Sequence, residues 1–199
     1  MKILGISGSP REGGNTDVAV REALRHSLTH GPLETELLRV GDHDLKHCTG
    51  CRQCMKLNRC VIEDDDFDEL WTRTTQADAL VVGAPVYWFG PPGLMKDFID
   101  RAHGPFAKGG SVLLKDRPVL LLSVAADSGF EPHEQTMSCW LTYYGAVVVD
   151  RVRLYARERG ELARDHKQMQ VIREAADRFC RVLLPGRSQP SPIRDREPR

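Results

Sequence analysis

The sequence predicts an α/β fold in which a parallel sheet is doubly wound, with helices on both faces. Short apolar runs alternate along the 199 residues with longer stretches of helical periodicity, which is typical of parallel strands joined by crossover helices. The first apolar run, Lys2–Ile6, leads directly into a Gly- and Ser-rich segment and then into an amphipathic stretch. This order predicts a strand, a phosphate-binding loop and a helix.

We expect strands and helices to alternate over most of the chain. Strands are predicted at Lys2–Ile6, Glu34–Val40, Ala79–Gly83, Pro118–Val124 and Val147–Leu154. Helices are predicted at Thr16–His30, Phe67–Gln76, Pro92–His103, His133–Tyr144 and Asp165–Leu184. Residues 1–184 are therefore expected to form one domain, with a cysteine-rich insertion at 47–60. Residues 185–199 have too little apolar content to pack and are expected to be disordered or to lie on a neighbouring chain.

Composition narrows the possible partners. The 28 acidic and 28 basic residues balance to a formal charge of zero, so no electrostatic footprint for nucleic acid or an anionic membrane is present. No apolar run approaches the roughly 20 residues of a membrane span, and the first strand starts too early for a secretory signal. We therefore expect a cytoplasmic protein with small-molecule or protein partners, in which thiols stay reduced.

Four of the six cysteines gather in one short stretch, at spacings typical of metal ligation: Cys48, Cys51, Cys54 and Cys60. Three thiols at such spacing can converge on a small volume, and a fourth completes a four-thiolate shell. Structural zinc more often uses two separated cysteine pairs. The pattern favours an iron–sulfur cluster, with a zinc site or a loop of free thiols as alternatives. Cys139 and Cys180 fall in predicted helices and are expected to be buried.

The loop after the first strand has the composition of an anion site. Its small residues let backbone N–H groups approach a phosphate, Ser9 and Thr16 add hydroxyls, and Arg11 adds a fixed charge. It matches neither the dinucleotide fingerprint nor the Walker pattern. In an open sheet of this class a ligand sits beyond the carboxyl ends of the strands.

With these motifs together, the chain resembles the flavodoxin-like NAD(P)H-dependent FMN reductases and, within them, the iron-sulfur flavoproteins. The phosphate loop of that family is similar to Gly8–Thr16, its second flavin loop to Ala84–Trp88, and its following helix to Leu94–Arg101. The resemblance implies a flavodoxin-like, five-stranded parallel sheet in the order 2-1-3-4-5 and makes residues 1–184 an FMN-binding domain. FMN would lie between the first and third strands.

The flavin site expected from the resemblance comprises three loops. The phosphate is assigned to Ser9, Arg11, Gly14, Asn15 and Thr16. The ring is assigned to Pro85, Val86, Tyr87, Trp88, Phe89 and Gly90, with Tyr87 and Trp88 placed to stack on it. Asp127 and Ser128, after the fourth strand, are expected at the ring edge. No catalytic side chain is expected, because the flavin carries the chemistry.

The function implied is electron transfer from NADH or NADPH through FMN, by way of a 4Fe-4S cluster on the four cysteines, to an unidentified acceptor. The alternatives are a noncatalytic flavodoxin-type carrier and a cluster-free flavin or quinone reductase. A homodimer or homotetramer is also implied. Lys96, Asp97, Asp100 and Arg101 stand at four-residue spacings on one predicted helix, where neighbouring charges pair, and we expect a role in structure or assembly.

Overall fold

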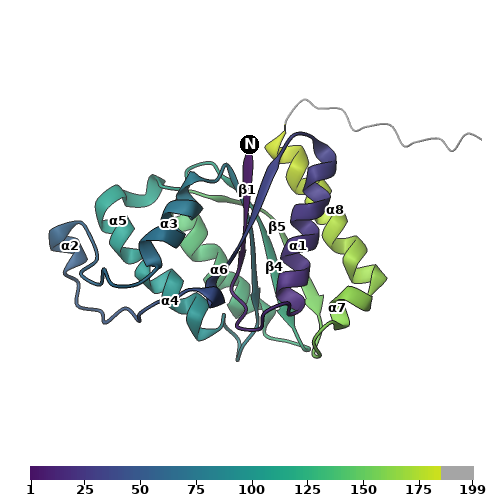
Figure 1. Cartoon of the computed structure of the whole chain (residues 1–199), viewed down its shortest axis with the longest axis horizontal. Coiled ribbons are helices and arrows are strands. Elements are labelled where there is room, and N and C mark those ends of the chain that lie inside the picture. Colours follow the sequence, from purple (N-terminus) through teal and green to yellow (C-terminus); the bar gives the residue numbers. More distant parts are fainter. Residues whose placement is uncertain (185–199) are drawn as a thin grey trace, which may run out of the picture.

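The computed structural model describes residues 1–184, so the tail expected at 185–199 lies outside the described residues. Figure 1 shows a sheet between two groups of helices. Its strands are β1 (Lys2–Ser7), β2 (Glu34–Arg39), β3 (Ala79–Pro85), β4 (Pro118–Ala125) and β5 (Val147–Tyr155). All neighbouring strands are parallel. The order β2-β1-β3-β4-β5 confirms the predicted topology.

The helices cover both faces of the sheet (Figure 1). One face carries α1 (Asn15–Ser27), α7 (Glu161–Arg164) and α8 (His166–Leu183), and the other carries α3 (Phe67–Gln76), α4 (Gly93–Arg101), α5 (His103–Gly109) and α6 (Phe130–Tyr143). The central strands β3 and β4 are buried almost throughout, which is why they are continuous apolar runs in the sequence. Among the described helices, none combines the length and apolarity needed to cross a bilayer.

Two glycines let α1 lie directly on the sheet. A Cβ atom on Gly83 of β3 would stand 2.5 Å from the Val20 side chain, and one on Gly5 of β1 would stand 2.6 Å from Leu24. Any larger residue would push α1 away from the strands. This close approach places the N-terminus of α1 at the carboxyl ends of β1 and β3, where a ligand is expected.

The predicted helices differ from the observed ones mainly at their ends. The helix expected at Pro92–His103 divides into α4 and α5, and α6 begins at Phe130 instead of His133. Gly129, at φ +88°, turns the chain into α6 three residues early. The short helices α2 (Cys54–Leu57) and α7 were not predicted, since one turn of helix leaves little periodicity to detect.

The prediction for the two isolated cysteines was half right. Cys180 is buried in α8, as expected, but Cys139 is exposed. On α6 its buried neighbours are Met137, Ser138, Trp140 and Leu141, whereas Cys139 lies on the outward side of the helix.

Candidate functional site

A cavity of about 460 Å³ opens at the carboxyl ends of β1, β3, β4 and β5. It is lined by Ser9, Arg11, Asn15, Thr16, Pro85, Val86, Tyr87, Val124, Ala125, Ala126, Asp127, Ala156 and Arg157. The structure thus brings together residues from all three predicted loops. Of the predicted residues, Gly14, Trp88, Phe89, Gly90 and Ser128 are not part of this lining.

A buried ion pair between Asp17 and Arg39 supports the phosphate loop. The Asp17 carboxylate is fully buried and accepts hydrogen bonds from Gly13 N–H at 2.8 Å, from Arg39 Nε at 2.7 Å and from the Ser7 hydroxyl. Arg39 also pairs with Asp42. Sequence reasoning missed Asp17 and Arg39, because charged residues in an amphipathic helix and at a strand end are usually exposed.

Within the loop, several groups shape the turn itself. Arg11 N–H donates to the Ser9 hydroxyl at 3.1 Å, and Gly14 N–H donates to the Arg11 carbonyl at 3.0 Å. A Cβ atom on Gly14 would stand 2.9 Å from that carbonyl, so the turn requires glycine there. Arg11 itself is exposed at the cavity. Its guanidinium and the free N–H groups at the start of α1 make this end of the cavity positive.

Asn15 links the phosphate loop to the segment after β5. Its side-chain amide donates to the Glu158 carbonyl at 2.8 Å, and its side-chain oxygen accepts from Leu162 N–H at 3.3 Å. The side chain predicted to bind phosphate therefore holds two loops together. Its backbone N–H, at the first helical position, is the group that can meet an anion.

The second loop ends in a tight aromatic turn. Tyr87 and Gly90 exchange backbone hydrogen bonds of 2.8 and 3.1 Å, and between them Trp88 and Phe89 have φ values of +46° and +67°. A turn with two positive φ angles usually contains Asn or Gly. Bulky residues in this conformation store strain, which tends to occur at functional sites.

The side chains of this turn differ in placement. Tyr87 lines the cavity, whereas Trp88 is 93% exposed. A Cβ atom on Gly129 would lie 3.2 Å from the Phe89 ring, so Phe89 packs over the start of α6. In this structure Trp88 stands at the rim as an exposed aromatic group.

The third loop and the segment after β5 close the other side of the cavity. Asp127 accepts from the Ser128 hydroxyl at 2.9 Å and pairs with Arg157 at 3.2 Å. A Cβ atom on Gly13 would lie 3.2 Å from the Arg159 guanidinium, so this second arginine lies beside the phosphate loop. The segment was not predicted, although the carboxyl end of every strand at this edge of the sheet points toward the crevice.

The four clustered cysteines also share one cavity, of about 50 Å³, with Arg101 and His103. Cys48 and Cys51 are exposed and Cys54 and Cys60 are half-buried. Among the described residues, no three of these sulfur atoms lie within 4.8 Å of one another, whereas a single zinc ion with Zn–S bonds of about 2.3 Å would bring them to about 3.8 Å.

Local hydrogen bonds act on two side chains of the cysteine loop, Cys51 and His47. A hydrogen bond from the Gln53 backbone, and a second from the Thr49 side chain, hold the pKa of the Cys51 thiol below its usual range. The thiolate is the form that binds metal. A hydrogen bond to Asp97 at 2.8 Å raises the pKa of His47 above its ordinary value.

Arg101 clamps the two ends of the cysteine loop. Its side chain is 1% exposed, and it donates to the Lys46 carbonyl at 3.1 Å, to the Ile62 carbonyl at 3.0 Å and to Asp65. Its Nε is buried without a hydrogen-bond partner among the described residues. The Arg101 side chain also lines the cavity of the four thiols.

Two charged side chains of α4 pair with each other on the surface, whereas Arg101 of the same helix is buried against the cysteine loop. Lys96 and Asp100 pair at 2.6 Å on the surface, as the spacing predicted. The predicted pairing of Asp97 with Arg101 is wrong, because Arg101 turns inward to Asp65 and Asp97 bonds His47. Arg101 thus ties α4 to the cysteine loop, and the expected role of this helix in assembly stays a prediction.

Comparison with known proteins identifies the relatives of this chain. The family model described as NADPH-dependent FMN reductase matches residues 1–159. An iron-sulfur flavoprotein of Methanocaldococcus jannaschii is 34% identical over 149 residues, covering 75% of this chain and 76% of the relative. One of Methanosarcina thermophila is 32% identical over 186 residues, covering 92% of this chain and 95% of the relative.

Solved structures show the same fold. A flavone reductase superposes with a TM-score of 0.75 at 21% identity, covering 92% of this chain, which spans 63% of that protein. An NADH:FMN oxidoreductase in its apo form superposes with a TM-score of 0.65 at 22% identity, covering 90% of this chain and 88% of that one. From the family match and the two archaeal relatives, the chain belongs to the NADPH-dependent FMN reductase family and to its iron-sulfur flavoprotein branch.

Proposed function

We propose that this chain transfers electrons from NAD(P)H through FMN to a 4Fe-4S cluster on Cys48, Cys51, Cys54 and Cys60, and from there to an acceptor. FMN-dependent oxidoreduction with NAD(P)H as cosubstrate follows from the family. The observation that carries the proposal is the cavity at the carboxyl ends of the strands, where the phosphate loop and the second loop meet.

The residues present fit FMN. A cavity of about 460 Å³ has the size of a typical cofactor site. Its positive end, formed by Arg11 and the start of α1, suits a phosphate. Its other end, between Pro85–Tyr87 and Ala125–Asp127, offers apolar surface and backbone groups to a flat ring. FMN bound there would supply the hydride acceptance and the single-electron release that the proposed function requires.

The protein's own part is to bind, orient and shield. Ser9 and Gly14 shape the phosphate loop, and Ser128 orients Asp127 through the hydrogen bond between their side chains. The strained turn with Trp88, Phe89 and Gly90 is assigned to the open side of the ring, where exposed aromatic surface can cover a nicotinamide. No side chain need donate or accept a proton during hydride transfer.

Replacing Arg11 with alanine is expected to weaken FMN binding about 10- to 150-fold, since a hydrogen bond to a charged group contributes about 1.5 to 3 kcal/mol. Fluorescence titration of the apoprotein with FMN measures this. Arg21→Ala is the matched control, because Arg21 is an exposed arginine further along α1 and outside the cavity. Equal FMN affinity of the two variants would remove Arg11 from the site.

Reduction by nicotinamide nucleotides separates an enzyme from a noncatalytic carrier. Anaerobic mixing of the FMN-loaded protein with NADH or NADPH in a stopped-flow instrument is expected to bleach the oxidised flavin within one turnover. Dithionite serves as the control for a reducible flavin. Bleaching by dithionite but by neither nucleotide would favour the carrier.

Assembly and location complete the proposal. The chain is proposed to form a homodimer or homotetramer, and the exposed aromatic turn beside the cavity gives such an assembly apolar surface to cover. Light scattering on the FMN-loaded protein tests this, with a monomer as the contrary result. A cytoplasmic location suits the four cysteines, because thiols remain reduced in that compartment.

A further inference from the structure

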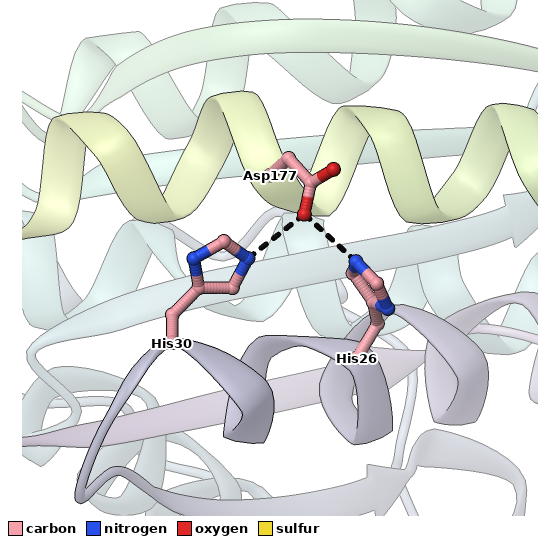
Figure 2. Close-up of side chains that lie close together, drawn as sticks. All are labelled: His26, His30 and Asp177. Atoms are coloured by element: carbon pink, nitrogen blue, oxygen red, sulfur yellow. Dashed lines mark hydrogen bonds and ion pairs between the residues drawn. The ribbon is translucent and has the colours of Figure 1, made fainter. Parts of the chain in front are cut away.

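His26, His30 and Asp177 converge where the end of α1 packs on α8 (Figure 2). The Nε2 atom of His26 lies 2.7 Å from Asp177 Oδ1, and that of His30 lies 2.8 Å from the same oxygen. The three ligand atoms all lie within 4.8 Å of one another. Figure 2 shows both rings directed at this single oxygen.

Sequence spacing brings the two histidines to one side of α1, and helix packing adds the aspartate. His26 and His30 are four residues apart, and the chain stays helical through Leu28 into the 3₁₀ turn η1 (Leu28–His30). Residues four apart share one face of a helix, and paired histidines at this spacing bind zinc in helical metal sites. Asp177 comes from the middle of α8 and faces them. Two packed helices therefore present three donors to one point.

Asp177 differs in its ion-pair partners from Glu22, another carboxylate where α1 packs on α8. Glu22 pairs with two arginines, Arg25 at 2.7 Å and Arg173 at 2.5 Å. Among the ion pairs of the described residues, Asp177 has only the two histidines. The half-buried Asp177 carboxylate therefore has no lysine or arginine partner among the described residues, and a divalent cation would give it a counter-charge.

We propose that His26, His30 and Asp177 form a zinc site that fastens α1 to α8. Two imidazole nitrogens and one carboxylate oxygen are typical zinc ligands, and zinc bonds of about 2.0 to 2.2 Å would set these atoms about 3.3 Å apart. The present 2.7 and 2.8 Å separations need only a small expansion. The side chains are 17 to 35% exposed, so water can complete a tetrahedral shell.

The site is independent of the proposed electron path. None of its three residues lines the cavity at the carboxyl ends of the strands or the cysteine cavity. The cysteine segment with α2 and the helix α8 lie on opposite sides of the molecule (Figure 1). A metal here would act as a cross-link between helices that are 151 positions apart at His26 and Asp177.

Equilibrium dialysis of the full-length, untagged, FMN-loaded protein against zinc chloride tests the site. The variants are Asp177→Asn and His30→Gln, which keep the size of each side chain close to the original. The control is His166→Gln, an exposed histidine at the start of α8. All four proteins keep the same cysteines, so zinc bound by those thiols cancels when the proteins are compared.

At micromolar zinc, the wild-type protein and His166→Gln are expected to hold one zinc per chain more than the two variants. Zinc is also expected to raise the Tm of the first two proteins and to leave the Tm of the variants unchanged, because a ligand of the folded state stabilises it. Retained FMN and unchanged NAD(P)H oxidation verify that the variants fold. Equal zinc content in all four proteins, or a difference seen only at millimolar zinc, would overturn the proposal.

Discussion

Replacing Arg101 with methionine is expected to lower the free energy of unfolding by about 3 to 5 kcal/mol, the usual cost of breaking a buried ion pair from one side. Asp65, whose side chain is 2% exposed, would keep a charge without its partner. The carbonyls of Lys46 and Ile62 would lose their donor as well. Denaturant unfolding of the cluster-free, FMN-loaded protein measures this change apart from any effect on iron.

The same helix provides a matched control. Lys96 and Asp100 are 47% and 43% exposed, and an exposed pair contributes only about 0 to 1 kcal/mol, so Lys96→Met should have little effect. The double variant Arg101→Met/Asp65→Leu removes both charges and should recover much of the loss. If Arg101→Met lowers the free energy of unfolding no more than Lys96→Met does, Arg101 does not hold the cysteine loop in place.

Replacing Cys51 with serine is expected to remove nearly all iron from anaerobically purified protein, from about four irons per chain in the wild type, because the cluster needs its four thiolates. FMN should remain bound, since Cys51 does not line the cavity proposed to hold FMN. Iron, acid-labile sulfide and flavin are measured on the same samples. Cys139→Ser is the control, because Cys139 is an exposed cysteine on α6.

The other possible outcomes separate the alternatives for this loop. Wild-type protein that holds FMN but no iron or sulfide after anaerobic reconstitution would reject the cluster and leave the reductase standing. One zinc per chain that depends on Cys51 but not on Asp177 would support a zinc-stapled loop. Iron retained by Cys51→Ser would place the ligands elsewhere.

The sheet could be predicted from sequence because its central strands are buried on both faces and so appear as apolar runs. The phosphate loop and the second loop were found for a similar reason, since each directly follows such a strand. Arg101 could not be found in this way. Its partner Asp65 is 36 positions away, and a charge on a helix is expected at the surface unless the fold supplies a distant partner.

Of the remaining differences between the prediction and the structure, two depend on long-range contacts and one on a local turn. Arg157 reaches the cavity only because the fifth strand ends at the same edge as the first. The exposure of Trp88 follows from the backbone conformation of its turn, which residue identity alone does not predict, since aromatic residues rarely adopt positive φ. The three-residue cluster of His26, His30 and Asp177 requires the packing of α8 on α1.

The ion pair between Asp17 and Arg39 has a consequence for how tightly the phosphate loop can hold a ligand. Fixing a flexible backbone costs about 1 to 2 kcal/mol of conformational entropy per residue, and this cost subtracts from affinity when a loop becomes ordered on binding. Asp17 holds Gly13 and Arg39 through buried hydrogen bonds, so the loop is ordered by folding itself. Little of the free energy gained from contacts with a phosphate is then offset by the cost of ordering the loop, so most of it contributes to affinity.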